Sequence, residues 1–336
     1  MGQNREQELP DEMEKEVKRE ERNSMYGRWR KSLSLGTLGK GLLVISIAVM
    51  LALFAACKVS DDASAAAQQM AATSAALTKY YDAIADSLTD TIALNELNES
   101  LLGVPFGDAD RKQIEAARAE ILKRRDLAQA LTRLSTSFGT LTGSKASTDV
   151  ATAATALGNE LITVKALPGG SPVPSALGKA GDFLIQLIQQ YQEKNAAQGM
   201  DGTMKALVEL FKKEQQVYDS LARQHIMLAS QVAKPLIDRR AVDPTPLLQP
   251  ALKPFGLSAN HADTQIEDTL RTLAKSRLAA TANGATKQEE EASAAMLKAL
   301  EEMSSRIDLL ATEKPMLLRT NPLSLKVVES WAASLI

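Results

Sequence analysis

The stretch Ser60–Leu101, SDDASAAAQQMAATSAALTKYYDAIADSLTDTIALNELNESL, decides the fold class of this chain. Ser60 and the two aspartates that follow it are typical of a helix start, because such side chains satisfy free backbone N–H groups and favour the helix dipole. The stretch predicts one helix, of roughly 60 Å at ~1.5 Å per residue. Its apolar stripe is suited to packing against other helices and consists of Met70, Leu77, Tyr81, Ile84 and Leu88.

A second helix is predicted over Asp110–Leu141, after a break at Gly103-Val104-Pro105, and Asp110 with Gln113 resembles a capping box. Its apolar stripe comprises Ile114, Ile121, Leu127, Leu131, Leu134 and Phe138. Its charged face, which we expect to be hydrated, comprises Arg111, Lys112, Glu115, Glu120, Lys123 and Arg124. Because a short connection keeps sequential helices side by side, we expect the two helices to pack antiparallel with Leu88 and Ile121 buried.

The rest of the chain continues in the same manner. Further helices are predicted over 149–166, from Ser175 to Gly199, from Asp201 to Pro235, from Asp263 onward with an interruption at Gly284, and over 323–336. Residues of high helix propensity dominate the composition, and β-branched runs of period two are missing. The predicted fold class is therefore all-α, a bundle of long antiparallel amphipathic helices after an N-terminal signal or anchor segment.

The prolines suggest how this bundle is organised. Five of the chain's 12 prolines fall within residues 235–254. We therefore expect a helical bundle over 57–234, a proline-rich connection over 235–261, and C-terminal helices over 262–336 that pack on the bundle. No internal repeat of fixed period is present.

An apolar run near the N-terminus indicates where the protein resides. The run Gly41–Cys57, GLLVISIAVMLALFAAC, follows a basic stretch and ends in two alanines and the chain's single cysteine. The order basic, apolar, small is that of a secretory signal. One cysteine also excludes an intramolecular disulfide, so the stability of the exported part must come from packing.

The ending Phe54-Ala55-Ala56-Cys57 resembles the lipobox of bacterial lipoproteins, with Phe54 where that class prefers leucine. The resemblance implies that 25–56 is a signal peptide recognised through Phe54, Ala55 and Ala56. It also implies cleavage before Cys57, which would be diacylated and hold the protein on the membrane. Lys58 in place of aspartate implies delivery to an outer membrane, facing the periplasm. Two alternatives are an uncleaved inner-membrane anchor over 41–56 and a buried core helix.

The first 24 residues do not fit a signal peptide. Met1–Ser24 contains eight acidic and five basic residues, whereas Met25–Lys40 contains four basic and no acidic ones. We therefore expect translation to begin at Met25 and Met1–Ser24 to be an upstream extension. The alternative is a real cytoplasmic tail, which would favour the membrane-anchor interpretation.

The search for catalytic chemistry gives few candidates. The chain has two histidines, and we interpret His225 as a solvated residue of a helix. His261, with Asp263 and Glu267, is a weak metal candidate, although acids at a helix start are the simpler explanation. Motifs such as H-E-x-x-H, G-x-S-x-G and the P-loop are absent from the sequence. We predict no catalytic, cofactor-binding or metal-ligating residue.

Three other features have structural interpretations. For the adjacent pair Tyr80–Tyr81 we expect one core and one surface residue, because neighbouring helical side chains point roughly 100° apart. We interpret the run Glu289–Glu291 as a solvated helix face. Met296 and Met303 are expected to lie in the core rather than at a cofactor site.

Charge and composition narrow the function. After Cys57 the chain keeps 30 basic and 33 acidic residues, and this balance argues against a nucleic-acid surface. The sequence favours a lipid-anchored cell-envelope protein that acts by contact with an envelope protein partner, as a scaffold or adaptor. The alternatives are a periplasmic sensor or regulatory domain on a single uncleaved anchor, and an enzyme of unrecognised type.

Overall fold

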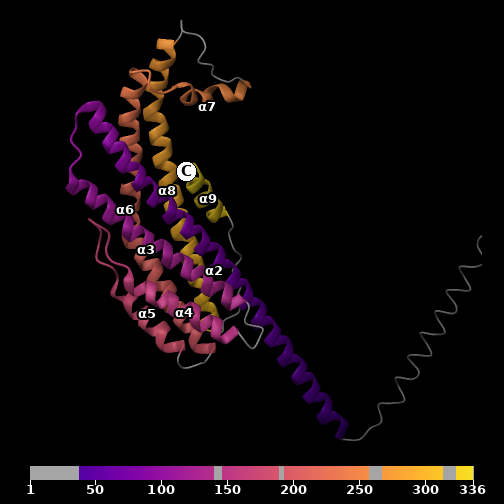
Figure 1. The fold of residues 1–336 in the computed structure, drawn as a ribbon. Coiled ribbons are helices and arrows are strands. Elements are labelled where there is room, and N and C mark those ends of the chain that lie inside the picture. Colours follow the sequence, from indigo (N-terminus) through magenta and orange to yellow (C-terminus); the bar gives the residue numbers. More distant parts are fainter. Residues whose placement is uncertain (1–37, 140–145, 189–192, 257–266, 313–322, 336) are drawn as a thin grey trace, which may run out of the picture. The chain divides into compact units, whose positions relative to one another are not determined.

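A computed structural model describes residues 38–139, 146–188, 193–256, 267–312 and 323–335, and every regular element within these ranges is helical (Figure 1). The all-α prediction is confirmed. The longer helices are α2 (Leu38–Leu102), α3 (Asp108–Gly139), α4 (Ala146–Thr163), α5 (Ser175–Ile188), α6 (Glu193–Asp238), α8 (Glu267–Ala311) and α9 (Leu323–Leu335). The short elements η1 (Thr245–Leu247), α7 (Gln249–Leu252) and η2 (Lys253–Phe255) lie between α6 and α8.

The chain divides into two compact units, Met1–Asp61 and Asp62–Ile336, and everything described below belongs to the second unit. The backbone of 41–57 is helical and forms part of α2, but its side chains lie outside the described residues. The lipobox residues Phe54, Ala55, Ala56 and Cys57 are among them, as is the leader 1–24. Where side chains are described, no helix is both long and apolar enough to cross a membrane.

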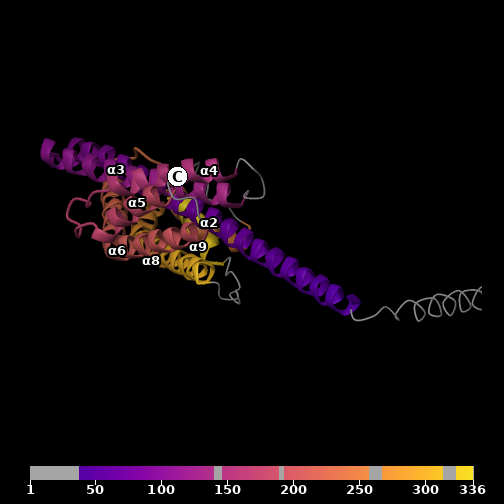
Figure 2. The same ribbon diagram turned by 90° about the horizontal axis from the view of Figure 1, so that it is seen from below.

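The part of helix α2 that belongs to the second unit contacts α3, α6, α8 and α9. It runs antiparallel to α3, as predicted: the Thr132 hydroxyl donates to Ser74 Oγ at 2.9 Å, and Arg111 pairs with Glu96 at 2.7 Å. Contacts of α2 with α6 and α9 are described below. Figures 1 and 2 show α2 and α3 side by side, with α6 and α8 running together along the same unit.

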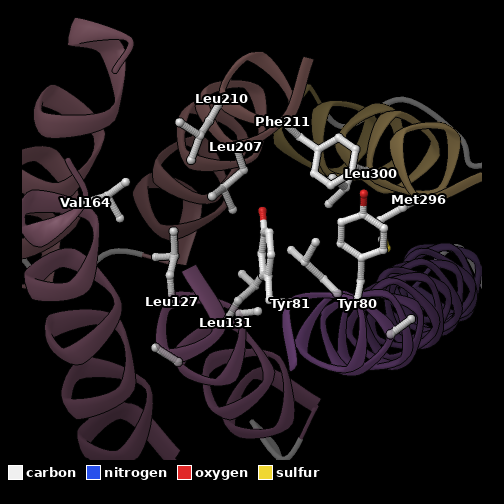
Figure 3. Packing of buried hydrophobic residues seen from close by; sticks show 14 of the residues in the cluster. Tyr80, Tyr81, Leu127, Leu131, Val164, Leu207, Leu210, Phe211, Met296 and Leu300 are labelled. Carbon is white, nitrogen blue, oxygen red and sulfur yellow. The ribbon is translucent and has the colours of Figure 1, made fainter. Parts of the chain in front are cut away.

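The predicted apolar stripes of α2 and α3 lie in the core, with Ile114 partly buried, and the side chain of Phe138 lies outside the described residues. Leu88 and Ile121 are buried, as are the seven-spaced residues of α2 and the methionines Met296 and Met303. Tyr80 and Tyr81 are both buried, so the expectation that one of them reaches the surface was wrong. The reason is that α2 is covered on more than one side. Figure 3 shows Tyr80 directed toward Phe211, Leu300 and Met296, and Tyr81 beside Leu131 and Leu207.

Glycine and proline delimit the helices less often than expected. Gly103 ends α2 with a φ of 67°, a left-handed conformation that glycine adopts without a steric cost. The predicted break near Gly199 was wrong, because α6 is continuous through it, and α8 likewise continues through Gly284. A glycine costs only about 1 kcal/mol in a helix, so one glycine does not end a helix of 45 or 46 residues. Pro235 is followed by three further residues of α6.

Helices α6 and α8 pack along most of their length in antiparallel register. Exposed ion pairs mark the register along this seam: Lys205–Asp308, Lys212–Glu301, Arg223–Glu290 and Asp238–Lys275. The compact unit includes both sides of the proline-rich segment, whose Thr245 and Leu248 are buried. The segment therefore packs against the helices.

Candidate functional site

Two buried polar groups meet the adjacent tyrosines of α2. Tyr81 lies beside an ionic network formed by α3 and α6. Tyr80 lies beside a pair of acidic residues, one on α6 and one on α8. The rings of both tyrosines contact Tyr218, and Tyr80 also contacts Phe211 and Trp331. The polar groups are therefore embedded in an aromatic part of the core.

The first group is a fully compensated ion pair. The guanidinium of Arg124 is completely buried and donates two hydrogen bonds to the carboxylate of Glu214, one of them from Nε to Oε2 at 2.7 Å. It also donates to the backbone oxygens of Glu120 at 2.8 Å and Lys165 at 2.7 Å. The Tyr218 hydroxyl donates to Glu214 Oε2. Burial alone would lower the pKa of Arg124, but its bonds to Glu214 raise it.

The expectation that Arg124 lies on a hydrated face was therefore wrong. Arg124 is seven residues from Leu131 and three from Ile121, so it falls on the apolar stripe of α3 and turns inward with it. The remainder of that face behaves as predicted, with the neighbouring Lys123 partly exposed and paired with Glu120 at 2.6 Å.

The second group is an acidic pair without such compensation. Glu289 of α8 is only 1% exposed, and neither of its carboxylate oxygens accepts a hydrogen bond from an amine, amide or hydroxyl group of a described residue. The same holds for Oδ1 of Asp219, the hydroxyl of Ser293 and the hydroxyl of Tyr80. These groups are close enough to perturb one another's titration, and a protonated Glu289 is a donor from which the neighbouring carboxyl of Asp219 can accept. Glu289, Ser293 and Tyr80 are buried, whereas Asp219 is partly exposed beside them.

The protonation of this pair follows from its surroundings. Burial, followed by the negative charge of Asp219, raises the pKa of Glu289 to about 8. Burial also raises the pKa of Asp219. The pKa of Tyr80 is raised, first by burial and then by the charge of Glu289, so Tyr80 stays neutral. At neutral pH Glu289 therefore holds a proton in the folded protein.

Glu289 corrects the expectation that Glu289–Glu291 forms a solvated face. Glu290 and Glu291 do face solvent, but Glu289 turns into the core. The cation whose charge acts on Glu289 is Arg223, which is half exposed and pairs with Glu290 at 2.7 Å. Because Arg223 pairs with Glu290 at the rim of the bundle, it neutralises little of the negative charge of the Asp219–Glu289 pair.

Of the two histidines, the structure describes His225 and corrects the prediction that it is solvated. His225 was expected to be solvated, but it is half-buried, and its Nδ1 lies 3.2 Å from the hydroxyl of Thr91 on α2. Burial lowers its pKa. The correction arises because α6 contacts α2 along a face that the spacing of α6 alone does not identify. His261 lies outside the described residues.

Of the three residues in the weak metal candidate, only Glu267 is described, and its carboxylate is paired with two arginines. Asp263 lies outside the described residues, and Glu267 forms ion pairs with Arg271 and Arg240. Within the described parts of the chain, no three metal-ligating side chains come together.

Comparisons of the chain with protein-family models, with curated proteins and with solved structures found no match.

The sequence contains a pattern from which the burial of Glu289 could have been predicted. Glu289 precedes Met296 and Met303 by seven and fourteen residues, so it continues the stripe that correctly predicted the core of α8. Glu214 likewise lies seven residues after Leu207. A charged residue that continues an apolar stripe of period seven marks a buried charge, but the sequence of one helix does not identify what lies opposite it.

Proposed function

We propose that this chain is a membrane-tethered helical regulatory protein that acts by contact with a partner protein and responds to protonation of the Asp219–Glu289 pair. One observation carries the proposal. Glu289 is buried beside a second acidic residue, and no cation or hydroxyl group among the described residues pairs with its carboxylate.

Such an arrangement is costly for a protein that only needs to be stable. A buried charge normally requires a partner of opposite sign, as Glu214 has in Arg124. An apolar side chain in place of Glu289 would continue the methionine stripe of α8 without this cost. Groups whose pKa is strongly shifted by burial and a specific neighbour are candidates for function. Glu289 is closed off from solvent, so binding and release of a proton suit it better than contact with a substrate.

The tether rests on the sequence. The basic, apolar and small segments that end at Cys57 support lipidation there, and two or three acyl chains at about 0.8 kcal/mol per buried CH₂ would hold the protein firmly. The partner in this proposal is an envelope protein. An uncleaved anchor over 41–56 would place the same regulatory unit on an inner membrane.

The pH dependence of stability tests the regulatory part. The pKa of Glu289 is higher in the folded chain than the ordinary carboxyl value of the unfolded chain, so folding is favoured most at low pH. This contribution is lost as pH rises toward about 8. The full chain in detergent micelles should therefore lose stability in urea between pH 5 and pH 8.

Two variants complete that experiment. Glu289→Gln should remove this part of the pH dependence, because it keeps the shape of the side chain without a titrating proton. Glu290→Gln, at an exposed neighbouring position, should leave the dependence unchanged. Parallel pH profiles for the wild-type chain and Glu289→Gln would refute the proposal.

The tether is tested by separate experiments. Cys57→Ser should abolish incorporation of labelled fatty acid and leave unprocessed precursor. A variant that is processed and labelled like the wild type would disprove lipidation at Cys57. A chain that begins at Met25 should be exported as well as the full reading frame. Loss of export on deletion of Met1–Ser24 would instead support a functional cytoplasmic tail.

A further inference from the structure

Helices α6 and α8 bring polar side chains together beside α2. The two helices run antiparallel, and the Arg223–Glu290 pair at 2.7 Å fixes their register. Asp219 therefore lies opposite Ser293, because each is about one turn farther along its own helix in the same direction from that pair. Glu289 precedes Ser293 by four residues and so shares its face of α8.

Tyr80 joins this group from α2. Figure 3 shows its side chain directed toward Met296, which is one turn after Ser293 on α8. Its ring also contacts the ring of Tyr218, the sequence neighbour of Asp219 on α6, at 6.0 Å between centres. The three helices thus bring two carboxyl and two hydroxyl groups together, with the partly exposed Asp219 on the solvent side.

These groups offer more acceptor atoms than a single proton can satisfy. The hydroxyl groups of Tyr80 and Ser293 are completely buried and have no hydrogen-bonding partner among the described residues. Both carboxylate oxygens of Glu289 and the Oδ1 atom of Asp219 are also buried. One proton shared between the two carboxyl groups supplies one donor, and buried acceptor atoms normally each have a donor. A ligand that fits here therefore carries a positive charge and several donors.

We propose that the Asp219–Glu289 pair is a binding site for the ε-ammonium group of a lysine of the partner protein. The ammonium group accepts no bond and donates to Asp219, Glu289 and Ser293, and the proton that the pair held is released to water. The inference rests on the proposed function, which supplies the partner protein and the exchangeable proton.

The chemistry of an ammonium group matches these acceptors better than that of a guanidinium group. An ammonium group has three N–H donors on one atom, whereas the planar fork of a guanidinium suits a single carboxylate, as Arg124 binds Glu214. The acceptors of the Asp219–Glu289 site belong to side chains of different helices, so they approach a ligand from several directions. Two carboxylates also favour a cation, because their charges repel each other when both are ionised.

The partly exposed Asp219 gives the site an entrance at the rim of the bundle. Arg223 and Glu290 lie at this rim, and their side chains are 51% and 48% exposed. Exposed pairs of this kind contribute little to stability, so both side chains can move aside at small cost. A lysine has a flexible four-carbon stem, which can pass between them while the ammonium group reaches the buried Glu289.

The charges around the site make binding depend on pH. The charged and titratable groups that face it are Tyr80 on α2, Asp219 and Arg223 on α6, and Glu289 and Glu290 on α8. Burial and the charge of Asp219 raise the pKa of Glu289, so a proton competes with the ammonium group at neutral pH. A lysine stays charged up to about pH 10, and its binding should therefore strengthen between pH 6 and pH 9.

The test uses the full chain in detergent micelles and methylammonium chloride, a small amine with the three donors of a lysine. Saturation-transfer NMR of its methyl signal measures binding at pH 6 and at pH 9. Tetramethylammonium chloride is the matched control, because it carries the same charge without an N–H group. We expect saturable binding of methylammonium that is about tenfold or more tighter at pH 9, and no saturable binding of the control.

Three variants locate the site. At pH 9, Glu289→Gln should weaken methylammonium binding by roughly tenfold or more, because it removes a charged acceptor, and Ser293→Ala by about threefold, because it removes a neutral one. Glu291→Gln should bind as the wild type does, since Glu291 is exposed and pairs with Lys287 at the surface. Equal binding by Glu289→Gln and the wild type would place the amine elsewhere and refute the site.

The occupant is tested with Nα-acetyl-lysine methylamide, its arginine counterpart and the free diamine putrescine. The lysine compound should bind about tenfold or more tighter than the arginine compound, and tighter than putrescine. Equal affinity for arginine would refute the ammonium assignment, and a preference for putrescine would assign the site to a free amine and overturn the partner's lysine. Absence of methylammonium binding, in a chain whose stability does depend on Glu289, would overturn this inference and leave the proposed function standing. Stability that does not depend on Glu289 would overturn both.

Discussion

Glu214 and Glu289 lie at comparable depth, each 1% exposed, on long helices that contact α2. Glu214 is held by the guanidinium of Arg124 and the hydroxyl of Tyr218. Glu289 faces Asp219, another acid, and no cation or hydroxyl group among the described residues pairs with its carboxylate. The two sites share one core, so their difference lies in the neighbours alone.

The comparison distinguishes a buried acid that stabilises the fold at any physiological pH from a buried acid whose effect on stability depends on pH. A buried ion pair with all its hydrogen bonds stays ionised over the physiological pH range and fixes the register of its helices. A buried acid beside another acid is stable only while it holds a proton. The first arrangement is indifferent to moderate changes in pH, whereas the second couples packing to pH. The following predictions test this distinction.

The largest effect is expected from Arg124→Met. The substitution leaves the carboxylate of Glu214 buried without its cation, which should cost about 3–5 kcal/mol in the free energy of unfolding. Arg125→Met is the matched control, because Arg125 is partly exposed and its ion pairs with Asp126 and Asp82 lie at the surface. Urea unfolding followed by circular dichroism measures both. Similar losses for the two variants would contradict the compensated pair.

An apolar truncation on the same helix calibrates that value. Ile121→Ala removes a completely buried side chain and should cost about 2–5 kcal/mol. Lys123→Ala should lie within about 0.5 kcal/mol of the wild type, because Lys123 is partly exposed and its pair with Glu120 is near the surface. Thermal melts suffice for this comparison. Equal stability of the two variants would mean that the faces of α3 are wrongly assigned.

Amide substitutions compare the two glutamates directly. Glu214→Gln removes the charge that Arg124 requires and should cost about 1.5–3 kcal/mol, the value of hydrogen bonds between charged groups. Glu289→Gln should be neutral below pH 5 and more stable than the wild type at pH 8, since it removes the cost of ionising a buried acid. Measurements at both pH values are needed. A comparable loss of stability for both variants at pH 8 would show that the two glutamates do not differ in this way.

The sequence predicted much of the fold for a physical reason. Helix propensity and stripes of period seven are local properties, so they predicted α3, the part of α2 after Ser60, their antiparallel packing, and the buried Leu88 and Ile121. The predicted helix start at Ser60 was wrong, because α2 is continuous from Leu38. The same stripes contained Glu214 and Glu289. Their charge favoured a solvated interpretation, and only the surrounding helices overrule it.

The pairing of the buried groups could not be predicted. Arg124 and Glu214 are 90 residues apart, and Asp219 and Glu289 are 70 residues apart. No local pattern distinguishes a glutamate that will meet arginine from one that will meet aspartate. Tyr80 and Tyr81 show the same limit, because both are buried only when more than one helix covers α2.

The smallest effect separates two tyrosine hydroxyl groups. Tyr218→Phe removes the hydroxyl that donates to Glu214 and should cost about 1 kcal/mol or somewhat more, because the acceptor is charged. Tyr80→Phe removes a buried hydroxyl without a described hydrogen-bonding partner and should be neutral or slightly stabilising. Both substitutions keep the aromatic ring, so the contacts of Tyr80 with Trp331 and of Tyr218 with Phe211 are retained. Urea unfolding at pH 6, where Glu289 is protonated, isolates the hydroxyl groups from the titration. A loss for Tyr80→Phe as large as that for Tyr218→Phe would show that the polar groups around Glu289 are satisfied, and the contrast between the two glutamates would then disappear.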